Sequence, residues 1–317
     1  EQAGRYYSDV FLQFNGTAGI WRKEAILNAG GWKDDTITED LDLSYRAQLH
    51  GYKVVFLEDV DTPAELPISI NDFKSQQYRW SKGAAQTARK LIGEVLRAKQ
   101  LSLFVRYHAA FHLFSSLLFL TCLLQTLLLV AIESLCVEPT ILILTNIINA
   151  ILMFITSYIG NSEAKRLTLN DNSHRQLDKK NNNNEHFLLK LVKFLFHFLL
   201  FISLIQAICL HNTIAVIDGL IRKKGEFKRT PKYSVETTKY QSKKSINDKK
   251  IHYQRKSIDW FALADITLAI VFILKTLHCI FFVGIWVKFG TIVLYSSLAV
   301  GYCVVSVASL LEVYTSK

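Results

Sequence analysis

Residues 38–49 read TEDLDLSYRAQL, a stretch with the pattern of an amphipathic helix in a soluble domain. Thr38 is placed to cap the helix, and three carboxylates follow in the first turn, where they stabilise the positive end of the helix dipole. Gly51 is placed to end the helix. Apolar side chains recur every four residues and share the inner face: Leu41, Tyr45 and Leu49.

Short elements of alternating type surround this helix and predict an α/β layer. Residues 10–14 and the buried run 54–57 are expected to be strands, because both are short and apolar. Residues 22–29 are expected to form a helix closed by two glycines, and a long helix capped by Asn71 is expected to run towards Lys99.

The composition indicates that a membrane part follows this soluble part. The chain is 50% hydrophobic and 20% charged, which argues against an ordinary soluble domain and against a disordered tail. Four long apolar runs begin after Arg106 and are expected to cross a membrane: 111–130, 141–158, 261–282 and 289–311. The five cysteines have no CxxC spacing and lie in or beside apolar stretches, as packed thiols do.

The basic residues set the expected topology. Residues 133–139 hold no Lys or Arg, whereas five lie within residues 161–186. The runs 111–130 and 141–158 are therefore expected to form a first hairpin that points outward from the cytoplasm, which makes the soluble part cytoplasmic. Both flanks of residues 187–216 are basic, which favours an interfacial or re-entrant helix; one ordinary transmembrane helix is the alternative.

The net charge of +10 does not indicate a nucleic-acid partner. Residues 218–259 hold 13 Lys and Arg against five Asp and Glu, and they lie between apolar segments. A basic loop of this kind is typical of the cytoplasmic face of a lipid bilayer.

Two clusters carry residue types suited to chemistry. Asp40, with Glu39 beside it, can act as a general base if a substrate hydroxyl lies within hydrogen-bond reach; simple helix capping is the alternative. Gln76, Arg79 and Trp80 share one helical face and can bind a pyrophosphate and a sugar ring; a salt-bridged domain helix has the same spacing.

These clusters, together with residues 14–19 (FNGTAG), resemble in order and spacing the acceptor half of the family 2 inverting glycosyltransferases. The similarity is to the membrane-embedded polysaccharide synthases related to cellulose synthase and to plant mannan synthases. It implies that Asp40 is the catalytic base, supported by Glu39. It also implies that the following residues bind substrate: Asn15, Gly16, Thr17, Gln76, Arg79 and Trp80.

Residues 227–232 (FKRTPK) resemble the FxVTxK gating loop of the same synthases. The resemblance implies that Phe227, Thr230 and Lys232 contact the nucleotide-sugar, with Arg229 in place of the usual Val. This departure is similar to the RTPK form of bacterial mannan-synthase-like members. A juxtamembrane basic patch that meets anionic lipid is the alternative interpretation.

The resemblance implies a partial GT-A domain, of α/β class, followed by an all-α multi-pass transmembrane bundle. The family's donor-binding half, with its DxD motif for Mg²⁺ or Mn²⁺, has no match here, so we expect the C-terminal portion of a longer synthase that is inactive alone. The expected order is an acceptor half (1–100), a transmembrane hairpin (101–160), a cytoplasmic loop (161–186), an interfacial or re-entrant apolar helix (187–217), a basic gating-like loop (218–258) and a second hairpin (259–313).

The predicted function is an inverting β-glycosyltransferase in the plasma (inner) membrane, with its catalytic part cytoplasmic. It moves a sugar from GDP-mannose or UDP-glucose to the end of a growing polysaccharide, with export through the membrane. A lipid-acceptor enzyme similar to ceramide glucosyltransferase is the alternative within the class. A transporter or channel is the alternative outside it, because charges such as Asp265 lie within the apolar spans.

Overall fold

The structure is a computed structural model, and it describes residues 1–16, 18–60, 62, 64, 66–67, 69–134, 140–170, 187–221, 260–282 and 289–315. The chain divides into two compact units. Unit 1 comprises Glu1–Leu123 and the segment that begins at Ile208, and unit 2 comprises Leu124–Ala207 and the segment Lys256–Thr315. Within the described residues every regular element is a helix.

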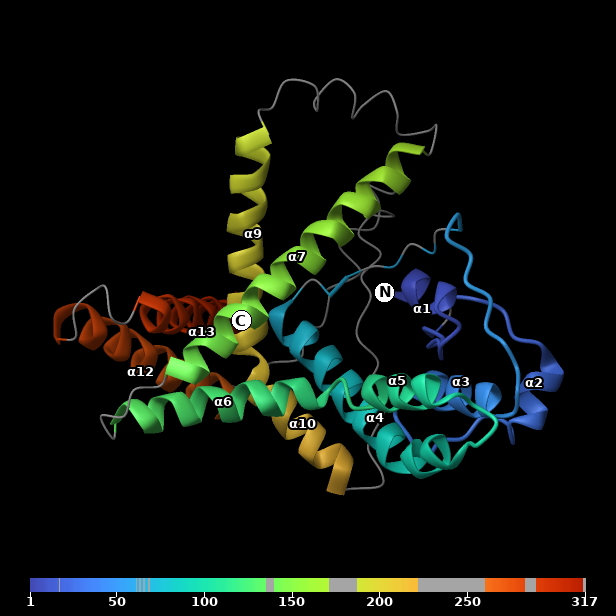
Figure 1. The fold of residues 1–317 in the computed structure, drawn as a ribbon. Coiled ribbons are helices and arrows are strands. Elements are labelled where there is room, and N and C mark those ends of the chain that lie inside the picture. Colours follow the sequence, from blue (N-terminus) through green and yellow to red (C-terminus); the bar gives the residue numbers. More distant parts are fainter. Residues whose placement is uncertain are drawn as a thin grey trace, which may run out of the picture. The chain divides into compact units, whose positions relative to one another are not determined.

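Unit 1 is built around helices α3 (Glu39–Leu49), α4 (Ile70–Arg97) and α5 (Leu103–Leu113), which pack on one another (Figure 1). Helices α1 (Gln2–Tyr7), α2 (Lys23–Asn28) and α10 (Cys209–Ile221) complete it, together with the start of α6 (Leu117–Ser134). The expected inner face of α3 is confirmed, because Leu41 and Tyr45 are buried and Leu49 packs against the same cluster. The buried core consists of Phe11, Leu41, Tyr45, Ala88, Leu91, Val95, Ala109 and Leu113.

The two expected strands are not present as strands among the described residues. The backbone N–H and C=O of Leu12 bond to the Gln48 side chain of α3 at 2.9 and 2.8 Å, so a helix side chain occupies the place of a neighbouring strand. Val55 and Leu57 are exposed by 66% and 62%, so residues 54–57 are not buried as expected. A strand needs a neighbouring strand to which its backbone bonds, and the described part of the chain supplies none to either segment.

Two helix starts differ from expectation. Ser69, not Asn71, caps α4, because its side chain accepts a 3.0 Å hydrogen bond from the Asp72 amide. Thr38 occupies the N-cap position of α3 without a side-chain capping bond. Its hydroxyl instead lies 3.3 Å from that of Thr87, so this residue joins α3 to α4.

The first predicted transmembrane run, 111–130, is divided between α5 and α6. The two helices meet at a bend of 66°, and Leu113 at the end of α5 is fully buried in the unit 1 core. Burial of this last turn against α3 and α4 explains why the apolar run does not continue as one straight helix.

Unit 2 contains the remainder of α6 with α7 (Thr140–Asn170), α9 (Phe187–Ala207), α12 (Trp260–Phe282) and α13 (Phe289–Thr315). Figure 1 shows α12 and α13 side by side as a hairpin, and α13 also packs on α9. Phe272 lies 5.9 Å from the ring centres of both Tyr295 and Tyr302. Ser297 of α13 donates a 3.0 Å hydrogen bond to Gln206 of α9.

Three described helices are long and apolar enough to cross a membrane: Leu188–Ala207, Trp260–Phe281 and Gly290–Glu312. The bent pair α5 and α6 would make a fourth if it counts as one span. The second hairpin thus has the helices that the sequence predicts. In α7 the apolar part is the shorter segment Ile147–Ser162, and the helix continues to Asn170, into the stretch expected to be a loop.

The expected apolar helix 187–217 is two helices, α9 and α10, separated at Ile208. Its first part alone has the length and hydropathy of a membrane span, whereas α10 belongs to unit 1 and packs on α4.

Candidate active site

Asp40, the predicted base, lies in the first turn of α3 and both of its carboxylate oxygens accept backbone hydrogen bonds. Oδ2 accepts one from the amide of Gly16 and Oδ1 one from that of Leu41, each at 2.8 Å. The carboxylate is therefore held in one orientation by the backbone at the start of a helix. It remains partly exposed, as a group that exchanges a proton with substrate must be.

The loop that contains Gly16 is itself anchored on α3. The amide of Phe14 donates a 2.9 Å hydrogen bond to the Ser44 hydroxyl, and the loop closes with a 3.0 Å bond from Ala18 N–H to Asn15 C=O. Gly16 has φ +57°, the left-handed region that favours glycine. Asn15 is exposed beside it, and Thr17 lies outside the described residues.

Arg79 of α4 lies within electrostatic reach of the two acidic residues. Burial lowers the pKa of Arg79, while the carboxylates of Glu39 and Asp40 raise it. The TED and QxxRW motifs, far apart in the sequence, therefore lie in the same part of unit 1. Gln76 is partly buried, and the Trp80 ring is 49% exposed, which leaves a flat apolar surface open to a ligand.

Residues that the motifs do not include hold α3 against α4. The backbone N–H of Ile37 donates a 3.0 Å hydrogen bond to Gln86 Oε1, and Gln86 is fully buried. A Cβ at Gly83 would collide with the Thr38 side chain, so glycine permits this close approach. Sequence reasoning missed both residues, although Gly83 and Gln86 follow Arg79 at four and seven positions, on the same helical face.

Asp42, the second acid of the DLD sequence, is fully buried and forms ion pairs. Its Oδ2 lies 2.7 Å from Arg46 and its Oδ1 lies 2.8 Å from Lys90 of α4. Arg46 also donates to the carbonyls of Ala29 and Gly31, so this cluster joins α3, α4 and the turn after α2. Sequence reasoning did not identify Arg46 or Lys90.

Lys90 also lies 2.7 Å from Asp35. Burial raises the pKa of Asp35, but the hydrogen bond and the positive charge of Lys90 outweigh that effect and leave the pKa below its usual value.

The described residues do not fit a divalent metal ion. No three His, Cys, Asp or Glu side chains among them are grouped for metal binding. Both oxygens of Asp42 face cations of the protein, and both oxygens of Asp40 accept backbone hydrogen bonds.

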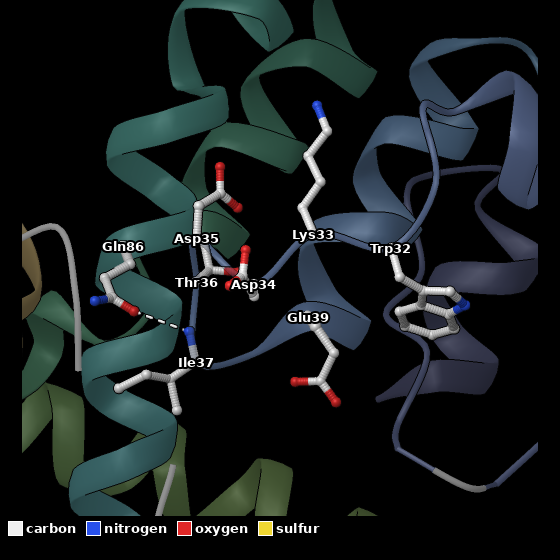
Figure 2. Close-up of a pocket in the computed structure, with 8 residues that line it drawn as sticks. All are labelled: Trp32, Lys33, Asp34, Asp35, Thr36, Ile37, Glu39 and Gln86. Atoms are coloured by element: carbon white, nitrogen blue, oxygen red, sulfur yellow. Dashed lines mark hydrogen bonds between the residues drawn. The ribbon is translucent and has the colours of Figure 1, made fainter. Parts of the chain in front are cut away.

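A depression of about 640 Å³ opens beside this site, and Figure 2 shows its lining side chains. In Figure 2, Gln86 lies at one end of the lining and the exposed Trp32 ring at the other, with Glu39 and further charged side chains between them. Its charged and polar lining includes Lys33, Asp34, Asp35, Glu39 and Gln86. The depression thus adjoins the acidic start of α3, while Asp40, Arg79 and Trp80 lie outside its lining.

The gating-like residues Phe227, Arg229, Thr230 and Lys232 lie outside the described residues.

Residues 4–159 match the family model for "Glycosyl transferase family group 2". This part of the chain is therefore similar to glycosyltransferases of family 2.

Several plant proteins are similar to this part of the chain. The chain is 46% identical over 105 residues to glucomannan 4-beta-mannosyltransferase 1 of Oryza sativa subsp. japonica, and 46% identical over 104 residues to the protein of the same name from Cyamopsis tetragonoloba. It is 43% identical over 114 residues to probable glucomannan 4-beta-mannosyltransferase 11 of Arabidopsis thaliana.

These alignments cover 33%, 33% and 36% of this chain, and 20%, 20% and 26% of the respective relatives. The similarity thus spans about a quarter or less of each relative. No solved structure matches the chain.

Proposed function

We propose that the chain supplies the acceptor side of the active site and the membrane region of a polysaccharide synthase. The proposed reaction transfers a hexose, with inversion, from a nucleotide-diphospho-sugar to the end of a β-linked polymer. The observation that carries it is that residues of three separate motifs come together: the Gly16 amide bonds to Asp40, and Arg79 lies within electrostatic reach of the same carboxylate.

In this reaction Asp40 accepts the proton of the acceptor hydroxyl. The hydroxyl oxygen forms a bond to the anomeric carbon of the donor as the bond to the diphosphate breaks, so the nucleoside diphosphate leaves with the electron pair. The amides of Gly16 and Leu41 hold the base in place, and such fixed geometry contributes to rate because the reactants need no further ordering. Glu39, the residue before the base, adds a second negative charge beside Asp40.

Arg79 is assigned to the leaving group and Trp80 to the acceptor. A guanidinium forms paired hydrogen bonds with phosphate oxygens, and its charge offsets the charge that develops on the diphosphate. The half-exposed Trp80 ring provides the surface on which a pyranose stacks, and Gln76, one turn before it, adds an amide. Asn15 and Thr17 of the FNGTAG loop are assigned to substrate contacts.

The mannosyltransferase names of the relatives favour GDP-mannose over UDP-glucose as donor. Donor binding, the DxD residues for Mg²⁺ or Mn²⁺ and the remaining strands of the α/β domain are assigned to a preceding part of a longer enzyme. The alternating exposure of residues 51–57, which suits the edge of a sheet, supports that assignment.

Processive export through a plasma-membrane bundle is part of the proposal, with the catalytic part cytoplasmic. Three apolar helices and the bent pair are consistent with such a bundle, and α9 is assigned to it as a transmembrane helix. Phe227, Arg229, Thr230 and Lys232 are proposed to close over the donor.

The test is product analysis with membrane vesicles that contain the full-length enzyme. Vesicles receive labelled GDP-mannose or UDP-glucose with Mg²⁺ or Mn²⁺, and the wild type is compared with Asp40→Asn. Glu94→Gln is the matched control, because Glu94 is an exposed acid on α4. We expect a long labelled polymer, sensitive to β-mannanase, from the wild type and from Glu94→Gln but not from Asp40→Asn.

Two results would overturn parts of the proposal. Label found only in the organic-solvent phase would indicate a lipid acceptor. Turnover retained in Asp40→Asn would remove Asp40 as the base, since loss of a general base costs about 10²–10⁴ in rate.

A further inference from the structure

Two helices of unit 1 that lie more than one hundred residues apart in the sequence, α4 and α10, cross at close range. A Cβ at Gly219 of α10 would collide with the backbone carbonyl of Lys82 and would lie 2.9 Å from the Ala85 Cβ. Ala215 and Val216 are fully buried on the same helix. The backbone of α10 therefore rests directly on the middle of α4.

At this crossing Asp218 bonds to two α4 side chains, one inside the QxxRW motif and one just after it. Its Oδ2 accepts a hydrogen bond from the Tyr78 hydroxyl at 3.3 Å and forms a salt bridge with Lys82. Tyr78 and Lys82 are one helical turn apart, and Arg79 and Trp80 lie between them in the sequence. The Lys82 and Asp218 side chains are only 10% and 14% exposed.

Further contacts extend the interface along α4. His211 lies 3.2 Å from the carbonyl of Lys74 and packs edge-on against the Tyr78 ring at 5.2 Å. Arg89 donates a 2.8 Å hydrogen bond to the carbonyl of Leu220. The contacts thus span about four helical turns, from one side of the motif to well beyond it.

This interface constrains the rotation of α4 about its own axis. Tyr78 faces α10, and Arg79, the next residue, points about 100° away. Arg79 lies within reach of the carboxylates of α3, and Gln86 on the same face bonds to the segment before α3. A rotation of α4 that relaxed the Asp218 contacts would therefore move Arg79 and Trp80 relative to Asp40.

We propose that Asp218 is a positioning residue for glycosyl transfer. It holds the turn of α4 that carries Arg79 and Trp80, and so sets where the acceptor sugar lies relative to the base. This inference rests on the proposed function, because it assigns Trp80 to the acceptor. Because α10 follows the apolar helix α9, Asp218 also links this later part of the chain to the proposed reaction, within unit 1.

The test compares Asp218→Asn with a matched control in the full-length enzyme. Asp9→Asn is that control, because it breaks an Asp–Lys pair of the same chemistry whose side chains are 83% and 80% exposed. Asp218→Glu keeps the charge, and the double charge exchange Lys82→Asp with Asp218→Lys restores a pair. Each variant is assayed for the acceptor KM with a short manno-oligosaccharide, the donor KM and kcat.

We expect Asp218→Asn to raise the acceptor KM and to lower kcat, with a loss in kcat/KM of about 10–10²-fold, since small misplacements at a reacting centre have effects of this size. The donor KM should change little. Asp218→Glu and the charge exchange should recover part of the loss. Asp9→Asn should behave as the wild type.

Hydrogen exchange of the α4 backbone in the same samples supplies a readout that needs no turnover. Faster exchange over residues 74–84 in Asp218→Asn, and not in Asp9→Asn, is the expected result. Unchanged exchange or an unchanged acceptor KM would overturn the positioning role. Absence of transfer by the wild type would instead overturn the proposed function, and the exchange data would still decide whether Asp218 orders this turn.

Discussion

The amide nitrogen of Gly16 lies 2.8 Å from Oδ2 of Asp40, across 24 residues of sequence. Because Gly16 has φ +57°, a β-branched side chain at this position would strain the loop that presents the amide. The orientation of the proposed base thus depends on the backbone conformation of one glycine.

Gly16→Val should therefore reduce transfer far more than Gly16→Asn does. Asparagine tolerates the left-handed region, whereas this conformation costs other L-residues about 1–2 kcal/mol and valine still more. Initial rates at saturating donor, with Gly4→Ala as control because a Cβ at Gly4 meets nothing within 4 Å, would check it. Equal rates for the valine and asparagine variants would contradict the role of the Gly16 amide.

Asp42→Asn should destabilise unit 1 without changing the response to metal. The substitution leaves Arg46 and Lys90 without their buried counter-charge, and removal of one partner from a buried ion pair costs about 3–5 kcal/mol. Thermal unfolding in detergent measures the loss, with the exposed Asp34→Asn as control. The Mn²⁺ concentration that gives half-maximal rate should stay the same in the folded fraction. A large shift in that concentration would indicate that Asp42 binds the metal.

Tyr45→Phe should cost about 1–3 kcal/mol, the penalty for a buried polar group that loses its partner. The Tyr45 hydroxyl lies 2.5 Å from His112 Nδ1 and donates to the Ala109 carbonyl at 3.2 Å. Arg5 can only donate, and it lies 2.6 Å from Nε2 of His112, so Nε2 is the ring nitrogen that accepts. Nδ1 therefore carries the ring hydrogen and donates a hydrogen bond to the Tyr45 hydroxyl. Burial raises the pKa of Tyr45, so the hydroxyl stays protonated at neutral pH.

The free energy of unfolding of Tyr45→Phe, beside that of Tyr7→Phe at a tyrosine that is 73% exposed, tests this network. Equal stability of the two variants would show that the hydrogen-bonded chain contributes nothing measurable.

Gly301→Ala should loosen unit 2. A Cβ at this position of α13 would collide with the backbone carbonyl of Ser203 in α9, so the helices must separate, and overpacking of this kind costs about 1–3 kcal/mol. Gly160→Ala, at an exposed position of α7 where a Cβ meets nothing within 4 Å, should not destabilise it. Melting curves in detergent compare the two. A Gly301→Ala variant as stable as Gly160→Ala would show that the helices are not in close contact.

Local sequence pattern was sufficient for several elements of the fold. The helix after residue 22 ends shortly before Gly30 and Gly31, both with positive φ, and the second hairpin has the helices α12 and α13 that its apolar runs predict. Residues 38–49 form the helix that their four-residue spacing predicts. These features depend on interactions between residues three or four positions apart or on the conformational freedom of glycine. A short stretch of sequence is therefore enough to predict them.

Other features depended on partners distant in the chain. The extended segment at Leu12 bonds to Gln48 instead of a strand, and the apolar run after Arg106 bends because its first turns pack in the core of unit 1. A window of sequence contains the preference of a segment but not the partner that satisfies its hydrogen bonds or buries its apolar face.

The sequence alone therefore determined the family resemblance, the candidate residues and the apolar helices. Only the tertiary structure decided that Asp42 forms ion pairs, that Gln86 and Lys90 join α4 to the segment around α3, and that Asp218 lies against Tyr78. The physical reason is that short-range geometry sets which side chains share a face of a helix. Which faces then meet depends on packing and charge pairing between segments far apart in the chain.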